Sequence, residues 1–290
     1  MLAYHGVVER YTDPRVEASF HLLADFRAQL AVLKKFRVVR LDELDAERAA
    51  GRVLPRVVIT FDDGFANNTL AAELLAEAKL PATFFVATGN VDAQQTIWPT
   101  LLRLVLARGS ARRITLAGID YDLERDCGAF AAIRDTFKRL PSAERLARFD
   151  ELYAQLRSGE LGELVAQFPS IAMMSWRDVR ELAAAGHAIG SHGRMHELQH
   201  ADQPPALREQ ELRGSKSEIE RAIEQQCDSF AFPNGTYHDG SAEEVRRCGY
   251  ARAFTMVSRA AGEREDPMLL PRIVAAGGAD QLLTKLFFGN

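Results

Sequence analysis

Short apolar runs and amphipathic segments alternate along the first third of the chain. Residues 2–4, 57–61 and 82–87 are apolar or β-branched runs, which are typical of short buried strands. Residues 20–36 and 69–78 instead carry apolar side chains at helical spacing. Strands that alternate with helices predict a parallel sheet, and the length of the chain fits a barrel. The expected fold class is therefore α/β.

The same alternation returns after about residue 172. Ser175 is expected to cap a helix that runs to Ala185, with Asp178 at its third position. The other elements expected in this part are strands at 188–190, 229–232, 253–257 and 270–273, and helices at 207–226 and 243–248.

Residues 92–172 interrupt the alternation. They hold an apolar run, an arginine-rich patch and then a helical stretch of mixed charge. We predict that they form a helical insertion or cap within a single barrel domain of residues 1–290. An extra solvated helical layer that shapes no cleft is the alternative interpretation.

The composition indicates a large apolar core and excludes two classes of site. The 290 residues are 47% hydrophobic and 26% charged, and the net charge of −4 gives no general affinity for nucleic acid. The three cysteines are widely spaced and form no CxxC pair. They therefore indicate neither a disulfide framework nor a thiolate metal site.

The two ends of the chain bear on its location. The first residues lack a basic segment followed by a long apolar run, so no signal peptide is recognised and a cytoplasmic location is expected. No stretch approaches the ~20 apolar residues of a membrane-spanning helix. Residues 282–288 are apolar enough for peripheral contact with a membrane or a partner, although packing against the barrel is the simpler expectation.

Two adjacent carboxylates, Asp62 and Asp63, directly follow the predicted strand at residues 57–61. In parallel α/β folds, catalytic groups lie at this carboxyl end of the strands. Neighbouring negative charges repel each other, so a cation or a proton is expected between them. With a metal ion, one carboxylate can serve as a ligand while the other remains free as a base.

Two histidines, His192 and His196, follow another predicted strand and are four residues apart. Two imidazoles and one carboxylate are a common ligand set for a catalytic zinc ion. His187 precedes the same strand and is interpreted as structural. His200 is a competing candidate ligand, but it lies beyond a predicted turn.

Two further strand ends carry polar groups. Residues 233–235, Pro-Asn-Gly, predict a tight turn whose backbone N–H is suited to an oxyanion hole, although a plain turn is the simpler explanation. His5 follows the first strand, and a histidine at that position is suited to protonating a leaving amine.

Residues 60–64, Thr-Phe-Asp-Asp-Gly, and residues 191–196, Ser-His-Gly-Arg-Met-His, resemble the first two motifs of the polysaccharide deacetylases. This family is also called the NodB-homology domain or carbohydrate esterase family four. The second motif departs from the family at Gly193, where Ser or Thr is usual. The resemblance covers roughly residues 1–90 and 173–275. It implies a distorted (β/α)7-type barrel and the metal-dependent removal of N- or O-acetyl groups from sugars.

The resemblance also implies roles for individual residues. Asp63, His192 and His196 correspond to the ligands of a divalent metal, most often zinc, which activates a water molecule and polarises the carbonyl group. Asp62 corresponds to the base that takes the proton of this water. The backbone N–H of Asn234 corresponds to a donor to the oxyanion.

The chain lacks two groups that the family usually has. An arginine usually stands two residues before the proline of the third motif, where this chain has Ala231. The candidate replacement is Arg272, and the other candidates for supporting the site are Pro233 and Trp176. The late Leu-x-His motif, which supplies the usual acid, is also absent. Residues 4–7, Tyr-His-Gly-Val, resemble instead the first strand of some biofilm-polysaccharide deacetylases, a permuted arrangement in which His5 is the acid.

The leading hypothesis is a zinc-dependent hydrolase of the acetyl group of a polysaccharide or a glycan precursor. One alternative is an allantoinase-like hydrolase of small cyclic amides that needs little or no metal. Another is a carbohydrate-binding or assembly protein without catalytic activity. The complete set of Asp63, His192 and His196 argues against the first alternative, and the retained base Asp62 argues against the second.

Overall fold

The computed structural model describes residues 1–44, 56–262 and 265–288. Its centre is a seven-stranded sheet in the order β10-β9-β8-β5-β4-β1-β11, and every neighbouring pair of strands is parallel. The expected parallel α/β sheet is thus confirmed. The strands are β1 (Leu2–Tyr4), β4 (Ile59–Phe61), β5 (Thr83–Val86), β8 (Ala188–Ser191), β9 (Ser229–Ala231), β10 (Arg252–Phe254) and β11 (Ile273–Val274).

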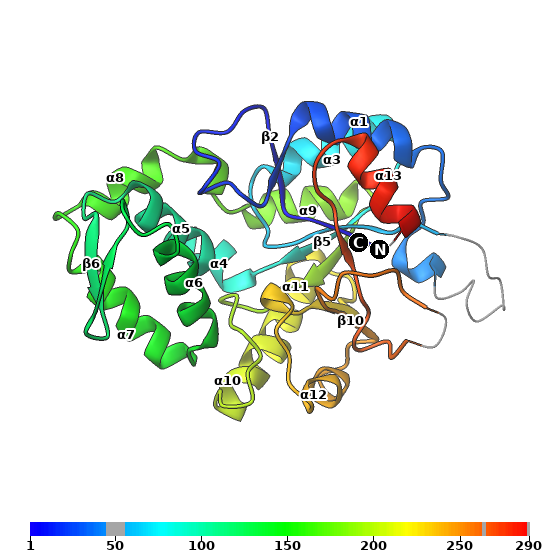
Figure 1. The fold of residues 1–290 in the computed structure, drawn as a ribbon. Helices are drawn as coiled ribbons and strands as arrows, with labels where there is room; N and C mark the ends of the chain where they lie inside the picture. Colours follow the sequence, from blue (N-terminus) through cyan, green and yellow to red (C-terminus); the bar gives the residue numbers. More distant parts are fainter. Residues whose placement is uncertain (45–55, 263–264, 289–290) are drawn as a thin grey trace.

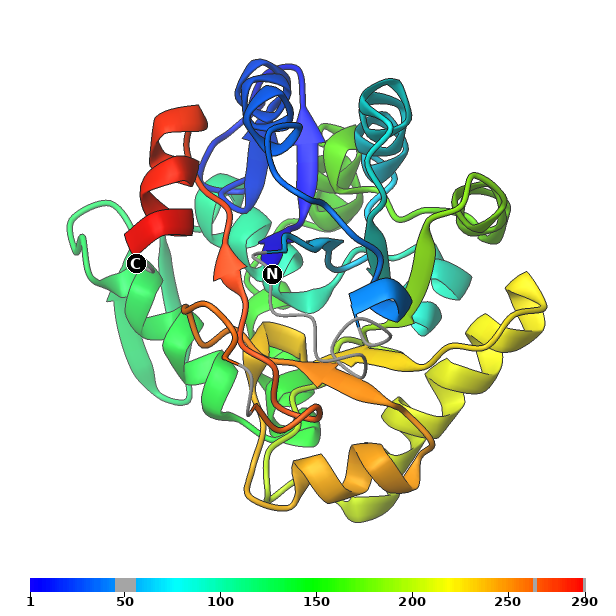
Figure 2. The ribbon, with the colours of Figure 1, turned by 90° about the vertical axis from the view of Figure 1, so that its right-hand side faces the viewer.

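The sheet curls so that its two edges approach the same stretch of chain. Leu270 forms a parallel bridge with Phe254 of β10, and Ile273 pairs with Leu2 of β1. Residues 270–274 therefore link the two edges of an incompletely closed barrel. Figure 2 shows the strands curving around a centre, with helices around the outside.

The strands are buried on both faces, as their nearly continuous apolar sequences require. On β4, Ile59 and Phe61 belong to the large core between the sheet and the outer helices. Val58 belongs to a smaller core inside the curl, and Thr60 bonds to a group on that side. Because side chains alternate along a strand, Asp62 continues the inward row.

The outer face of the sheet is covered by helices that follow the strands. They are α1 (Leu23–Leu33), α3 (Asn68–Ala78), α9 (Trp176–Ala184), α11 (Ser215–Ile223) and α12 (Ser241–Arg247). The last helix, α13 (Ala279–Phe288), packs on α1, as Figure 1 shows. Its Leu282 is buried. In the part of the chain that the structure describes, no helix has the length and apolar character to cross a membrane.

Local predictions agree with the structure to different degrees. The predicted capping box of α9 is present, with Ser175 accepting from the N–H of Asp178. The predicted helix at 20–36 is wrong at its start, because residues 20–22 form β3 (Phe20–Leu22), which pairs with β2 (Gly6–Val8). The predicted helix at 207–226 is divided into α10 (Pro205–Glu209), the π-helical η2 (Gln210–Gly214) and α11.

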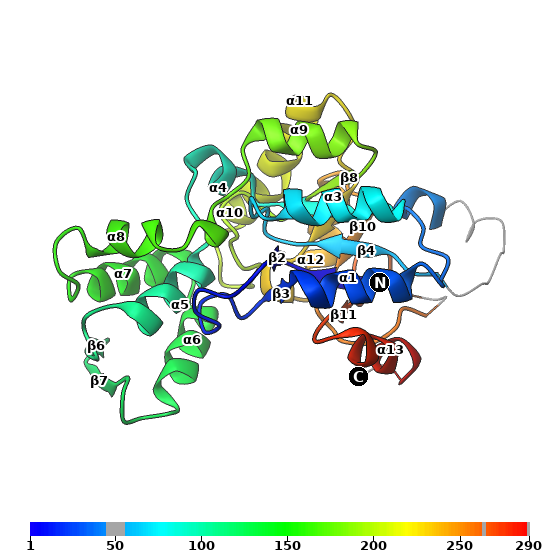
Figure 3. The same cartoon turned by 90° about the horizontal axis from the view of Figure 1, so that it is seen from above.

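Most of the segment between β5 and α9 forms a lobe beside the sheet, seen in Figures 1 and 3. Trp98, Phe137 and Phe149 help to form its own apolar core. The sequence does not predict the hairpin in this lobe, because its turn places Ala117 at a positive φ of 51°, where sequence rules expect glycine, asparagine or aspartate. The elements are α4 (Thr88–Ala93), α5 (Trp98–Arg108), β6 (Arg113–Leu116), β7 (Ile119–Asp122), α6 (Ala129–Arg139), α7 (Ser142–Tyr153) and α8 (Glu160–Ala166).

Candidate active site

Three buried side chains meet at the carboxyl ends of β4 and β8. Asp63 Oδ1 lies 3.2 Å from His192 Nε2 and 3.4 Å from His196 Nε2. The three ligand atoms lie within 4.8 Å of one another. The sequence prediction that Asp63, His192 and His196 come together therefore agrees with the geometry.

The hydrogen bonding of His192 tests whether these residues fit a cation. The Nδ1–H of His192 donates to the carbonyl oxygen of Ala231 at 2.8 Å. In neutral His192 the lone pair of Nε2 then faces the carboxylate of Asp63, so two acceptors confront each other. A divalent cation between them would resolve this conflict, and the donor set of two imidazoles and a carboxylate suits zinc.

The charges at this centre are strongly coupled. Burial would raise the pKa of Asp63, but hydrogen bonds from His192 and His196 and the charge of His5 hold it well below its usual value. Burial lowers the pKa of His196 despite the opposing effect of Asp63. Both shifts favour the protonation states that a metal ligand needs, which are an ionised carboxylate and a neutral imidazole. Burial would also lower the pKa of His192, but its hydrogen bond to Asp63 and the charge of Asp62 raise it, so a metal ion would have to displace a proton from this histidine.

The backbone at the site adopts the left-handed conformation at three residues that are not glycine. The φ angles are 78° at Asp63, 54° at His196 and 52° at Asn234. Such residues cost on the order of 1–3 kcal/mol each, and they persist only where the surrounding structure holds them. The strain therefore indicates that packing positions these side chains.

Asp62 pairs with a fully buried arginine from the far end of the chain. Arg272 donates from Nη1 to Oδ1 and from Nη2 to Oδ2 of Asp62, both at 2.7 Å. Its other donors reach Thr60 Oγ1 at 3.0 Å and the carbonyl oxygen of Thr255 at 3.2 Å. The structure thus places Arg272 beside Asp62, where the missing arginine of the third motif would have been needed.

Arg272 determines the ionisation of Asp62. Burial alone would raise the pKa of this carboxyl group, but the charge and hydrogen bonds of Arg272, together with His192 and His5, lower it below its usual value. Asp62 is therefore ionised at neutral pH. Because each carboxylate oxygen has two lone pairs, Asp62 can still accept a proton while Arg272 holds it.

His5 lies at the neighbouring strand end. Tyr4 pairs with Phe61 in the sheet, and the N–H of Asp62 donates to the carbonyl oxygen of Tyr4 at 2.9 Å. The charge of His5 contributes to lowering the pKa of both Asp62 and Asp63. His5, at the start of the chain, is thus brought to the two carboxylates near residue 60.

The other residues that the sequence suggested for the site lie outside the triad of Asp63, His192 and His196. Pro233 is buried behind Gly193, and Asn234 follows it as an exposed residue. Trp176 donates from its indole N–H to Asp92 at 2.5 Å, which joins α9 to α4. His187 packs edge-on against Phe84, and His200 bonds through Nε2 to the carbonyl oxygen of Lys138, so neither joins the triad.

Sequence reasoning missed the residues that hold the loop between the two histidines. The indole of Trp98 donates to the carbonyl oxygen of His196 at 3.0 Å. Arg145 stacks over this indole and pairs with Glu197. Glu211 accepts hydrogen bonds from backbone N–H groups of the same loop. Trp98 and Arg145 come from the lobe, where no motif pointed to the site.

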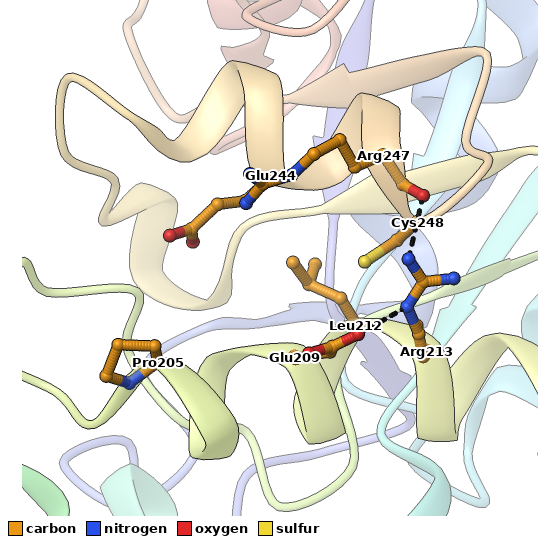
Figure 4. Close-up of a pocket in the computed structure, with 7 residues that line it drawn as sticks. All are labelled: Pro205, Glu209, Leu212, Arg213, Glu244, Arg247 and Cys248. Atoms are coloured by element: carbon orange, nitrogen blue, oxygen red, sulfur yellow. Dashed lines mark hydrogen bonds and ion pairs between the residues drawn. The ribbon is translucent and has the colours of Figure 1, made fainter.

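A surface pocket lies away from this centre, between η2 and α12. Figure 4 shows Leu212, Cys248 and the ion pair of Glu209 with Arg213 among its lining residues. None of its lining residues belongs to the triad or contacts Asp62. The chemistry described above is therefore not located in this pocket.

Comparisons with known proteins identify the family. A family model described as polysaccharide deacetylase matches residues 53–121 and 147–253, which is more than half of the chain. No curated protein sequence matches the chain significantly.

Several solved structures share the fold along nearly the whole chain. Streptococcus pyogenes deacetylase PplD in complex with acetate has a TM-score of 0.65 at 17% identity, over 98% of this chain and 96% of that one. IcaB from Ammonifex degensii has a TM-score of 0.61 at 18% identity, over 99% and 95%. A de-N-acetylase from Aggregatibacter actinomycetemcomitans has 0.59 at 15% identity, over 98% of each chain. These likenesses confirm the distorted barrel, and with the family match they show that the chain belongs to the polysaccharide deacetylase family.

Proposed function

We propose that this chain hydrolyses the acetyl group, N-linked or alternatively O-linked, of a sugar in a polysaccharide or glycan precursor, with a divalent metal, most suitably zinc. The observation that carries the proposal is the ionised Asp62 held by Arg272 beside a buried Asp63–His192–His196 cluster. A base and a metal-ligand set at neighbouring strand ends are the two parts that water-dependent amide hydrolysis requires.

The bound metal would supply polarisation of the substrate carbonyl and a lowered pKa for the attacking water. Asp62 takes a proton from this water as the new C–O bond forms. His5 donates a proton to the leaving nitrogen as the C–N bond breaks. The products are acetate and the free amine. A backbone N–H of Asn234 that faces the developing oxyanion would stabilise it.

We also propose that the lobe formed by residues 92–172 caps the substrate site. Trp98 of the lobe bonds to the backbone of His196, so the lobe adjoins the metal cluster. Burial lowers the pKa of Arg103 on α5, and the charge of Asp63 opposes this shift, which supports a role for this guanidinium near the site. Within the described residues, no hydrogen bond or ion pair engages Arg103, so its N–H groups are available to a ligand.

The test is acetate release from a panel of N- and O-acetylated oligosaccharides. We expect release that a chelator abolishes and added zinc restores. Asp62→Asn is expected to lose acetate release while its metal content, measured by elemental analysis, stays at that of the parent protein. Full activity in Asp62→Asn, or a parent protein that binds no metal after reconstitution, would overturn the proposal.

A further inference from the structure

The loop that carries both histidine ligands is held by contacts from other segments. Gly193 and His196 both have positive φ angles, 77° and 54°, which glycine adopts readily but histidine does not. The left-handed conformation of His196 therefore needs support from the surrounding structure. The metal cluster depends on this conformation, because His192 and His196 must approach Asp63 from the two ends of the loop.

A buried carboxylate, Glu211 of η2, supplies such contacts. Its Oε2 accepts hydrogen bonds from the backbone N–H groups of Arg194 at 2.8 Å, Met195 at 3.0 Å and Glu197 at 3.3 Å. Its Oε1 also accepts from Met195 at 3.2 Å. Successive backbone N–H groups that converge on one point form a site for an anion. Here the protein's own side chain is that anion.

The position of Glu211 also accounts for the unusual glycine in the second motif. A Cβ atom built on Gly193 would lie 2.6 Å from Glu211 Oε2, closer than real Cβ contacts allow. The carboxylate therefore occupies the space that any side chain at residue 193 would need. The φ angle of 77° at Gly193 and the fixed carboxylate of Glu211 therefore both favour glycine over the usual Ser or Thr.

Burying this carboxylate is unfavourable in isolation. Glu211 is 2% exposed, and burial together with the charge of Glu197 raises its pKa to about 7. An apolar residue would fill the same volume without this cost. What an apolar residue cannot do is accept the three N–H groups of the loop. The π-helical geometry of η2, a feature frequent at functional sites, presents Glu211 to the loop.

We infer that Glu211, together with Gly193, is a positioning element for the metal centre, which holds the loop at 193–197 so that His192 and His196 meet Asp63. The inference rests on the metal site of the proposed function. It adds a residue and a mutual dependence that the known motifs do not contain.

The test is zinc affinity, measured by competition with a chromophoric chelator on the purified full chain. Glu211→Met keeps the volume and removes the acceptors, whereas Glu211→Gln keeps one acceptor oxygen. We expect the dissociation constant to rise about 10–100-fold in Glu211→Met, the range found for residues that support metal ligands, and less in Glu211→Gln. The visible spectrum of the cobalt-substituted protein reports the geometry of the metal ligands. It should therefore change more in Glu211→Met than in Glu211→Gln.

Glu209→Gln is the matched control. Glu209 lies two residues earlier in the same helical stretch, and its ion pair with Arg213 faces the surface pocket of Figure 4. This variant should bind zinc as the parent protein does. Zinc binding in Glu211→Met equal to the parent would overturn the inference while leaving the proposed function intact. A parent protein without zinc binding would overturn both.

A second arm tests the mutual dependence, and its first variant leaves Glu211 unchanged. Gly193→Ala should weaken zinc binding strongly in the parent, through both the clash with Glu211 and the left-handed backbone. In a Glu211→Ala background the clash is removed, so the further loss caused by Gly193→Ala should be smaller. Equal losses in the two backgrounds would refute the dependence between these residues.

Discussion

The ion pair of Arg272 with Asp62 provides the sharpest test of how the site is built. We consider Arg272→Met, which keeps most of the apolar length of the side chain and removes all five N–H donors. The change leaves Asp62 buried without its counter-ion, in a place that is 2% exposed. It also removes the donors to Thr60 and to the carbonyl oxygen of Thr255.

The magnitude follows from the burial of both partners. The guanidinium of Arg272 is fully buried and holds Asp62 through two hydrogen bonds of 2.7 Å. Breaking a buried pair by removing one partner costs about 3–5 kcal/mol, because a charge is left uncompensated. Since each 1.4 kcal/mol is about tenfold in an equilibrium constant, the ratio of folded to unfolded protein should fall by roughly two to four powers of ten.

The same change should alter the pH dependence of catalysis. Asp62 has a lowered pKa because Arg272, with His192 and His5, outweighs the effect of burial. Without Arg272, burial raises the pKa of Asp62, so the base becomes protonated at a higher pH. A lowered carboxyl pKa also stabilises the fold above the unfolded value of about 3.9, and this contribution is lost as the pH falls through the folded value. In the variant both the acidic limb of kcat/KM and the acid denaturation midpoint should move to higher pH.

The assays are urea denaturation of the metal-free protein and the pH profile of acetate release. The matched control is the double variant Asp62→Leu with Arg272→Met, in which neither buried charge remains. It should be more stable than Arg272→Met alone, because replacing a whole buried pair is often nearly neutral. An Arg272→Met protein within about 1 kcal/mol of the parent stability, a typical value for a single mutation, with an unchanged acidic limb, would refute the reasoning.

Two further predictions concern residues on either side of this pair. His5→Ala should lower kcat by about 100-fold or more, the typical contribution of a general acid, with unchanged metal content by elemental analysis; an unaltered kcat would remove His5 from the reaction. Arg103→Gln should raise KM for an acetylated oligosaccharide more than it lowers kcat, because the lobe is proposed to bind the sugar chain and not the reacting atoms. Steady-state kinetics on an acetylated tetrasaccharide and on a monosaccharide distinguish an effect on binding of the sugar chain from an effect on the reacting atoms. Equal KM values in parent and variant would contradict the role of the lobe as a cap.

The sequence predicted the parts of the fold and site that depend on local patterns. The strand ending at Asp62 and the histidines after β8 could be recognised because a buried run is followed at once by polar ligands. The position of Arg272 beside Asp62 could not be predicted without knowing that residues 270–274 lie between β10 and β1 and close the curl of the sheet. Arg272, in the late segment Leu-Pro-Arg-Ile, is a candidate replacement for the missing motif arginine, but no local pattern predicts its two bonds to Asp62.

Other contacts could not be predicted because they depend on long-range packing. Glu211 lies at an ordinary polar position of an amphipathic segment, and only the π-helical turn directs it to the loop. Trp98 and Arg145 reach the histidine loop from the lobe, where no short motif points to the site. The strand at Phe20–Leu22 was mistaken for helix, because its partner Gly6–Val8 is distant in sequence and outweighs the helical spacing.

The departures of this chain from the family pattern share one physical explanation. At residue 231 an arginine is missing, and a guanidinium from residue 272 fills the place next to Asp62. At residue 193 a side chain is missing, and the carboxylate of Glu211 fills the space above the loop. In both cases the group is supplied from another segment, and the charge or hydrogen bond at the site is retained. In this chain, residues outside the family motifs therefore complete the surroundings of the metal cluster. Restoring the usual residue at position 231 or 193 should therefore harm the protein less when Arg272 or Glu211 is changed with it.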